Sequence, residues 1–518
     1  MAKAADVKTG GQTTRPMNGS EYLESLRDGR NVWIYGEKVD DVTTHPAFRN
    51  GARSVARLYD ALHDPEHKDA LTAPTDTGSG GFTHPFFRAP TSAEDLVRGR
   101  DAIAAWQRLT YGWMGRSPDY KAAFLATYGP NADYYTPFEE NARRWYREAQ
   151  EQVLFMNHTL VNPPVDRNRE IHEVEDIFVH AVKETDEGVV VRGAKMVATG
   201  SAYSNYNFVS YHGSTPIKKS EYAISFFAPM DHPNIRLICR PSYEFTAATV
   251  GSPYDYPLSS RFDENDAVLV FEDALIPWEN FLINGNLEIA STYHLTGFIW
   301  RALMQGCTRL AVKLDFLAGM FMKAVEATGT LEFRGIQASI GEILAWRHMF
   351  WALTDAMCHN PVPSANGSVL PNIEAASAYR ILSNQAYPII KGIIENQTGG
   401  ALIVRPSSRD WKSAELRPLL DQFYRGSADY SAEEKIKLVN LLWDSIGSEF
   451  GGRHELYERS YSGSHELTKL ECYWMAQGDG TVDRLKEFVE KCMSEYDLDG
   501  WKVPDLVSPD DVSVLGTA

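Results

Sequence analysis

The chain has 518 residues, which exceeds a single simple hydrophobic core and predicts two or three domains. Hydrophobic residues make up 43% and charged residues 23%, as in soluble globular proteins. The 51 basic and 69 acidic residues give a net charge of −18, which disfavours partners such as nucleic acid or an anionic membrane. No apolar segment resembles a signal peptide or a membrane span, and the five scattered cysteines are typical of reduced thiols. We therefore expect a cytoplasmic protein.

Residues 17–150 are predicted to be mainly helical. Ser92 is placed to cap a helix whose first turn is acidic and whose apolar residues recur at helical spacing as far as Trp106. A second amphipathic helix is expected from Asn141. The sequence thus predicts a first, mainly helical domain over 1–157.

The pattern changes near residue 160 to alternating, valine-rich segments. In DIFVHAVKETDEGVVVRGAKMVATG, the turn signal DEG separates two predicted strands. Further strand-like segments follow, and we expect a central β domain over 158–283.

Helical periodicity returns after residue 290, so the remaining part, 284–518, is expected to be a helical bundle with a tail. Gly329 is expected to end the first long helix. Seven residues at alternating steps of three and four form a seam for packing against other helices. They are Leu303, Cys307, Leu310, Leu314, Leu317, Phe321 and Ala324.

Several familiar catalytic signatures are incomplete. TGSGGF at 77–82 neither follows a clear strand nor opens a helix, and no dinucleotide-binding glycine fingerprint occurs. HELYE at 454–458 lacks the second histidine of a zinc motif, and no Cys/His cluster has metal-ligand spacing. A G-x-S-x-G nucleophile elbow is also missing. The sequence predicts neither a metal site nor a built-in nicotinamide site.

A few polar side chains stand in apolar surroundings. Arg116 and Tyr120, in YGWMGRSPDY, either cap and pack at the end of a helix or donate hydrogen bonds to an oxygen of a ligand. His158, where helix gives way to extended chain, is either structural or an acid–base group. Thr199 before Gly200 is either turn chemistry or a contact to a flat ligand. Local pattern leaves these alternatives open.

Longer motifs resemble a known family, and this resemblance favours the ligand-binding alternatives. YGEKVDDVTTHPAFRN, YGWMGRSPDYKAAF, GSPYDYPLSSRFDENDAVLVFEDALIPWEN, TGTLEFRGIQA, SEFGGRHELYE and MSEYDLDGW run through nearly the whole chain. They resemble the oxygenase component of the 4-hydroxyphenylacetate 3-hydroxylase family of two-component flavin monooxygenases. The resemblance implies an α+β multidomain, acyl-CoA dehydrogenase-like fold. Its parts are an N-terminal helical domain, a central β-barrel-like domain and a C-terminal four-helix bundle.

The resemblance also assigns residues. Arg116, Tyr120 and His158 match the side chains that hold the phenolic oxygen of the substrate. Arg334 resembles an arginine that reaches the flavin diphosphate of a neighbouring subunit. The other residues expected at the flavin are His158, Thr159, Leu160, Pro164, Val165, Asp166, Arg167, Thr199, Ser464, His465, Glu466 and Leu467.

The loop over 205–220 differs from the family pattern. In the family it closes over the substrate and binds its carboxylate through hydroxyl residues. Ser214 and Thr215 match those residues, and a shift of two or three positions would put Tyr211 and His212 there instead. All four are therefore substrate-binding candidates, and the group opposite the phenol stays open.

The activity implied by the resemblance is ortho-hydroxylation of a 4-substituted phenol to a catechol through a flavin C4a-hydroperoxide. The phenol is 4-hydroxyphenylacetate, 4-coumarate or a tyrosine-like compound. Reduced FAD would come from a separate NAD(P)H-flavin reductase, O2 would be the co-substrate, and a homotetramer is expected. The alternatives are a chlorinated phenol or a tyrosyl group tethered to a carrier protein, an acyl-CoA dehydrogenase-type flavoprotein, and a non-catalytic helical scaffold.

Overall fold

The computed structural model describes residues 14–166, 168–174, 176–211, 217–427, 429–461, 463–498 and 500–503. The chain divides into two compact units, Met1–Arg459 and Ser460–Ala518, which are described separately below. None of the helices in the described ranges combines the length and the apolarity that crossing a membrane requires. The three-domain division expected from the sequence stays a prediction.

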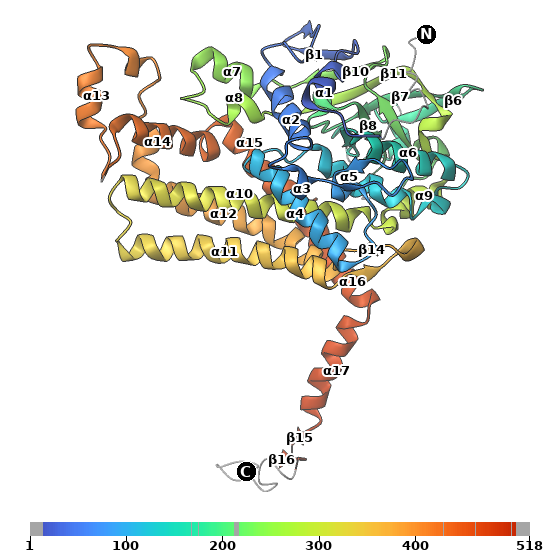
Figure 1. Ribbon diagram of the computed structural model, residues 1–518. Helices are drawn as coiled ribbons and strands as arrows, with labels where there is room; N and C mark the ends of the chain where they lie inside the picture. Colours follow the sequence, from blue (N-terminus) through green and yellow to red (C-terminus); the bar gives the residue numbers. More distant parts are fainter. Residues whose placement is uncertain are drawn as a thin grey trace. The chain divides into compact units, whose positions relative to one another are not determined.

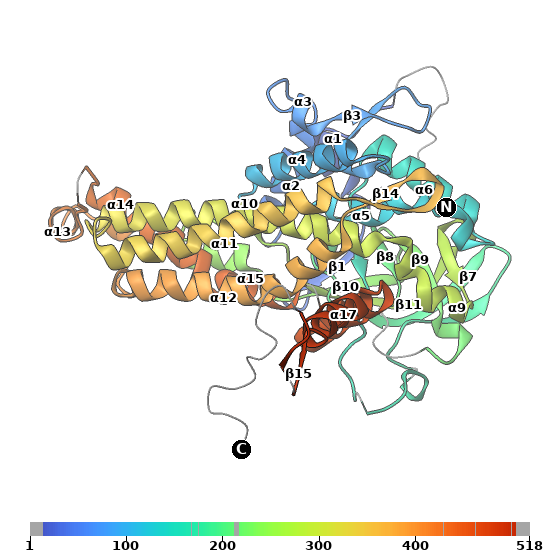
Figure 2. The ribbon, with the colours of Figure 1, turned by 90° about the horizontal axis from the view of Figure 1, so that it is seen from below.

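Four helices of the first unit lie side by side as a bundle (Figure 1 and Figure 2). They are α10 (Phe298–Ala327), α11 (Arg334–His359), α12 (Ile373–Ile403) and α14 (Ala432–Ile446). All seven residues of the predicted seam are buried in α10, so the bundle core lies where the periodicity indicates. Gly329, with φ +71°, follows the end of α10 as expected.

Two sheets form the central part of the first unit. Among the described residues, six strands form the larger sheet in the order β2-β1-β10-β11-β7-β6, and four form the smaller sheet in the order β12-β9-β8-β5. The larger sheet contains β1 (Asn31–Ile34), β2 (Glu37–Lys38), β6 (His180–Glu184), β7 (Gly188–Lys195), β10 (Ile235–Cys239) and β11 (Ala267–Pro277). The smaller contains β5 (Met156–Thr159), β8 (Tyr206–Val209), β9 (Ile224–Pro229) and β12 (Phe281–Asn284).

One feature of the larger sheet differs from the sequence-based expectation. The short hairpin β1–β2 lies in the segment expected to be helical, yet β1 pairs in parallel with β10, about two hundred residues later. A four-residue strand carries too little alternation to be recognised locally, because its pairing partner is distant in sequence. The β6–β7 hairpin is confirmed at its predicted DEG turn.

The N-terminal helices cover this region. Ser92 caps α4 (Ala93–Leu109) through its side chain, as predicted, and α6 (Glu139–Gln152) is the helix expected from Asn141. The other helices of the first unit are α1 (Gly19–Ser25), α2 (Arg49–Ala61), α3 (Lys68–Leu71), α5 (Pro118–Tyr128), α7 (Tyr243–Val250), α8 (Ser259–Phe262), α9 (Leu287–Thr292), α13 (Arg417–Phe423) and α15 (Glu449–Ser460). Its remaining strands are β3 (Ala73–Pro74), β4 (Phe82–Thr83), β13 (Val362–Pro363) and β14 (Val369–Leu370).

The second unit contains two helices and a small hairpin in its described residues. Its elements are α16 (His465–Gly478), α17 (Thr481–Met493), β15 (Tyr496–Asp497) and β16 (Gly500–Trp501). Ser464 caps α16 by accepting a hydrogen bond from the backbone N–H of Leu467 at 3.3 Å.

Candidate active site

The connection between α4 and α5 is held close to two other helices by glycine. Gly112 has φ +75°, and a Cβ atom there would lie 2.7 Å from the backbone nitrogen of Lys313 in α10. A Cβ atom on Gly115 would lie 2.3 Å from the hydroxyl oxygen of Tyr457 in α15. Side chains at these two positions would push the connection away, so the glycines are required by close packing.

Arg116 and Tyr120 meet just beyond these glycines. Arg116 precedes α5 instead of ending a long helix, because Pro118 starts a new helix at its first position. The guanidinium carbon of Arg116 lies 4.1 Å from the centre of the Tyr120 ring, a cation–π contact. The backbone N–H of Arg116 donates to Oε1 of Glu264 at 2.5 Å, which fixes the position of its main chain.

His158 joins this pair from the smaller sheet. It lies in β5, where it is paired with Phe208 of the parallel strand β8. Its ring centre is 5.4 Å from that of Tyr120 and 5.9 Å from that of Phe124. The structure therefore brings together Arg116, Tyr120 and His158, which we call the phenol triad after the role that the sequence predicts for them.

Thr199 lies next to the phenol triad. It precedes Gly200, whose φ is +72°, and a Cβ atom on Gly200 would lie 3.7 Å from both Cβ of Arg116 and Nδ2 of Asn157. The Thr199 hydroxyl donates to Oδ1 of Asp266 at 2.6 Å. The turn that carries Thr199 thus lies next to Arg116 and next to β5, the strand that contains His158.

Thr159 and Leu160 continue from His158. Thr159 is buried, and its hydroxyl has no hydrogen-bond partner among the described residues, so it is a polar group that a ligand can satisfy. The carbonyl of Leu160 accepts from Nζ of Lys195 at 3.3 Å. The same amine donates to Oδ1 of Asn162 at 2.8 Å and fixes the segment that leaves β5.

Other candidates are placed less directly. Pro164, Val165 and Asp166 lie in a loop outside any helix or strand, and Pro164 and Asp166 are exposed. Arg167 lies outside the described residues. Arg334 is exposed at the start of α11, and its expected role requires a second subunit.

Four candidates belong to the second unit. Ser464 precedes α16, and His465, Glu466 and Leu467 form its first turn. Their contact with a flavin stays a prediction.

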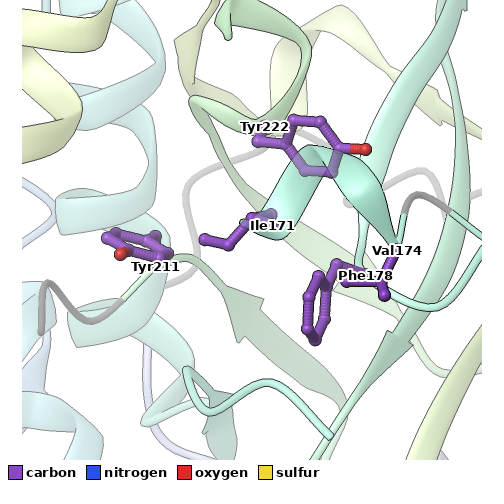
Figure 3. Packing of buried hydrophobic residues seen from close by; sticks show 5 residues of the cluster. All are labelled: Ile171, Val174, Phe178, Tyr211 and Tyr222. Atoms are coloured by element: carbon purple, nitrogen blue, oxygen red, sulfur yellow. The ribbon is translucent and has the colours of Figure 1, made fainter. Parts of the chain in front are cut away.

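The substrate-loop candidates divide between described and undescribed residues. His212, Ser214 and Thr215 lie outside the described part of the chain. Tyr211 is buried, and its carbonyl accepts from the hydroxyl of Tyr293 at 2.7 Å. Both sides of the loop rest on one apolar cluster in which Ile171 lies in the middle (Figure 3). This loop-base cluster consists of Ile171, Val174, Phe178, Tyr211 and Tyr222.

A buried charge cluster lies below the glycine-rich connection. Glu458 of α15 accepts from Arg309 through both oxygens at 2.6 Å and from Nζ of Lys313 at 2.9 Å. Burial alone would raise the pKa of Glu458, but these two cations outweigh it and lower the pKa to about 2. The carboxylate is therefore ionised and holds α15 against α10.

Lys121 shows the opposite electrostatic behaviour beside the phenol triad. Its amine is buried 3.0 Å from the centre of the Phe124 ring. Burial, and then the positive charge of Arg116, hold the pKa of Lys121 well below its usual value. Burial therefore shifts Lys121 toward its uncharged form, whereas the guanidinium of Arg116 stays cationic.

Local sequence reasoning missed the residues that support Arg116 and Thr199. Glu264 and Asp266 come from RFDENDAV, and Arg453 and Tyr457 come from α15. One signal was available, because Arg453 and Tyr457 are four residues apart and share one face of a helix. Their partners are distant in sequence, so no local pattern connects them.

Comparison with known proteins decides the family. The family description "4-hydroxyphenylacetate 3-hydroxylase N terminal" matches residues 18–283, and its "C terminal" counterpart matches residues 289–490. The chain belongs to the 4-hydroxyphenylacetate 3-hydroxylase family.

Relatives in the family match nearly end to end. A Rhodococcus sp. protein named "4-nitrophenol 2-monooxygenase, oxygenase component" is 55% identical over 97% of this chain and 96% of its own length. A Streptomyces globisporus protein is 54% identical over 96% of this chain and 94% of its own length. Its name is "(3S)-3-amino-3-(3-chloro-4-hydroxyphenyl)propanoyl-[peptidyl-carrier protein SgcC2] monooxygenase".

A solved structure of the 4-hydroxyphenylacetate 3-hydroxylase family supports the fold. The oxygenase component of 4-hydroxyphenylacetate 3-monooxygenase, in complex with FAD and 4-hydroxyphenylacetate, superposes with a TM-score of 0.87 at 33% identity. The match covers 92% of this chain and 99% of that one. The family, the fold class and the enzyme class expected from the sequence, an aromatic monooxygenase oxygenase component, are thereby confirmed.

Proposed function

We propose that this chain ortho-hydroxylates a 4-substituted phenol to a catechol, as the oxygenase component of a two-component flavin-dependent monooxygenase. The observation that carries the proposal is the convergence of Arg116, which precedes α5, with Tyr120 of α5 and His158 of β5 in one partly buried corner. Family membership and the named relatives support the same reaction.

FAD fits the residues beside this corner. Thr159 presents a buried hydroxyl that lacks a partner in the described part of the chain, and Thr199 stands at a tight turn that adjoins Arg116. Thr159, Leu160 and Thr199 would hold the ring system. For Ser464, His465, Glu466 and Leu467, the proposed contact with a flavin rests on the family resemblance. When bound in reduced form, FAD supplies the electrons and activates O2 for the transfer of one oxygen atom.

The phenol triad prepares the substrate. A phenol has a pKa near ~10, so its more nucleophilic phenolate form needs stabilisation at neutral pH. Arg116 provides a permanent positive charge and Tyr120 a hydrogen-bond donor at the phenolic oxygen. His158 accepts the phenolic proton. Because these groups are held in place before the reaction, they stabilise negative charge without reorganising.

The surroundings keep water out of the corner. Trp113 and Met114 are buried, and Phe124 and Phe208 pack against the His158 side. A dry site strengthens the attraction between Arg116 and the phenolate, and it limits the loss of activated oxygen as hydrogen peroxide.

The proposed site defines the substrate by its phenol group. 4-Hydroxyphenylacetate, 4-coumarate and tyrosine-like compounds share the group that the phenol triad would bind. The names of the two relatives reported above support the alternative of a substituted phenol or a carrier-tethered hydroxyphenyl group. Tyr211, with His212, Ser214 and Thr215, would meet the far end of the substrate.

Partners are part of the same proposal. A separate NAD(P)H-flavin reductase would deliver reduced FAD, since the relatives are named as oxygenase components. A homotetramer would let Arg334 reach a neighbouring subunit's flavin. The free cysteines support a cytoplasmic location.

The test combines the protein with reduced FAD, O2 and a panel of phenols. We expect a catechol, detected by mass spectrometry as the phenol plus one oxygen atom, from at least one member. Omission of the phenol serves as the control and should leave hydrogen peroxide as the oxygen product. Peroxide alone with every phenol of the panel would contradict the proposal.

A further inference from the structure

The carboxylates that support the phenol triad and Thr199 share one cation. Arg453 of α15 donates to Asp266 through Nε at 3.0 Å and through a terminal nitrogen at 2.7 Å. Its other terminal nitrogen lies 3.5 Å from Oε2 of Glu264. We call Glu264, Asp266 and Arg453 the carboxylate–arginine cluster.

Each carboxylate of this cluster holds a different part of the site. Glu264 accepts the backbone N–H of Arg116, on the phenol side. Asp266 accepts the hydroxyl of Thr199, on the flavin side. One guanidinium therefore lies between the supports of both sides.

The two sides depend on Arg453 to different degrees. Asp266 also accepts from Nε of Arg240 at 2.9 Å, so it keeps a cation when Arg453 is removed. Glu264 is buried, and burial raises its pKa while the positive charge of Arg453 opposes that rise. Loss of Arg453 would leave Glu264 with its strongest counter-charge missing, and Arg116 should be disturbed more than Thr199.

Tyr457 extends the contact from the same helix face. Its ring centre lies 5.2 Å from the guanidinium carbon of Arg453 and 5.5 Å from that of Arg116. The segment HELYE, which fails as a zinc motif, thus belongs to a helix whose charged and aromatic face supports the site.

We propose that Arg453 is a positioning residue that fixes the phenol-binding Arg116 relative to the flavin-side Thr199. This inference rests on the proposed function, because it assigns the phenol to Arg116 and the flavin to Thr199. Transfer of an oxygen atom demands close alignment of the reacting groups, and a misplacement of about 1 Å costs about 100-fold in rate.

The test uses Arg453→Gln in the full-length protein, first without turnover. 4-Nitrophenol is the probe, because its phenolate absorbs visible light and its phenol form does not. A well-placed Arg116 favours the phenolate of the bound probe, so Arg453→Gln should reduce the phenolate fraction. The binding of oxidised FAD, measured by its absorption change, should weaken less, since Arg240 still holds Asp266.

Turnover with reduced FAD and O2 supplies a second readout. We expect the ratio of catechol to hydrogen peroxide to fall by about 100-fold in Arg453→Gln. Arg453→Lys keeps the charge but loses the paired donors, and it should recover part of the phenolate fraction. If thermal unfolding shows that Arg453→Gln does not fold, Arg453→Lys is the variant that tests the positioning role.

The matched control is Arg192→Gln. Arg192 makes a paired contact with Asp273 at 2.7 and 2.8 Å on the exposed surface of the same unit. This variant should behave like the wild type in every readout. A folded Arg453 variant with an unchanged nitrophenol spectrum and product ratio would overturn the positioning role. A wild-type protein that neither binds nitrophenol nor forms catechol would instead overturn the proposed function.

Discussion

The two ends of the proposed substrate site are held in place by different kinds of contact. Around Arg116 the chain is fixed by glycine contacts, by a hydrogen bond from its backbone to Glu264 and by buried ion pairs. Around Tyr211 it is fixed by the loop-base cluster, which is apolar (Figure 3). Directional contacts fix a charge at one point, whereas apolar packing tolerates changes of shape at similar volume.

This difference in contacts matches what the proposed reaction requires at each end of the site. The reaction at the phenol requires one geometry, so any change in Arg116 or its supports should affect chemistry. The group opposite the phenol needs only a pocket of suitable size, so a change in the loop should leave the reaction intact. Aromatic contacts join the ends, since Tyr293 binds the carbonyl of Tyr211 and stacks on Phe298, which stacks on Phe124.

The largest effect is expected from Arg116→Ala. Loss of the positive charge at the phenolic oxygen should lower catechol formation by about 1000-fold, the scale of removing one preorganised stabilising group. Oxidation of reduced FAD should continue and yield hydrogen peroxide. Arg108→Ala is the control, because Arg108 is exposed near the end of α4 and pairs with Asp315 at 3.2 Å. Unchanged catechol yield would remove Arg116 from the phenol triad.

A smaller loss is expected from His158→Ala. Without its proton acceptor the phenol reacts more slowly, by about 100-fold, and the rate should rise more steeply with pH. Rates measured across roughly pH 6 to 9 test this, since free imidazole titrates in that range. His294→Ala removes an exposed histidine of the same unit and is the control. A wild-type rate and pH profile in His158→Ala would assign His158 a structural role.

The other end of the site should respond in selectivity. Replacing residues 205–220 by the corresponding loop of a relative should change the preference among phenols by about tenfold or more, the scale of altered apolar contacts. The total yield of catechol per reduced FAD on the better phenol should stay close to that of the wild type. Identical preference after the exchange would mean that residues outside the loop select the substrate.

The phenol end could be predicted further than the loop end. Arg116 and Tyr120 lie four residues apart, and the long motif around them resembles the family closely enough to be assigned. Glu264 and Arg453 could not be assigned, because their contacts join segments far apart in sequence. The strand β1 was missed for the same reason, since its partner β10 lies in another predicted domain.

At the loop end, the prediction was limited by the register of residues 205–220 against the family pattern. A shift of three residues exchanges Tyr211 and His212 for Ser214 and Thr215, and the sequence offers no turn signal that fixes the register. The structure places Tyr211 in the loop-base cluster, a contact that depends on Ile171 and Phe178 from a separate segment. Apolar contacts of this kind leave no distinct sequence motif.

The smallest effect is expected from Lys195→Met, which tests whether the loop end contains a titrating charge. Lys195 lies 5.9 Å from the centre of the Tyr211 ring, and its amine is bonded to the carbonyl of Leu160 and to Asn162. Burial lowers the pKa of Lys195 to about 7. Below that pH both the folded and the unfolded chain bind the proton, and burying the charge weakens folding.

Above that pH the folded chain releases the proton first, so the unfolded chain binds more protons and stability rises with pH. The wild type should therefore gain about 1 kcal/mol over Lys195→Met in the first pH unit above the folded pKa. Urea unfolding of both proteins at a series of pH values measures this difference. A gap that stays constant with pH would show that Lys195 is charged in the folded protein throughout. The loop end would then contain a buried charge, as the phenol end does, and the contrast between the two ends would narrow.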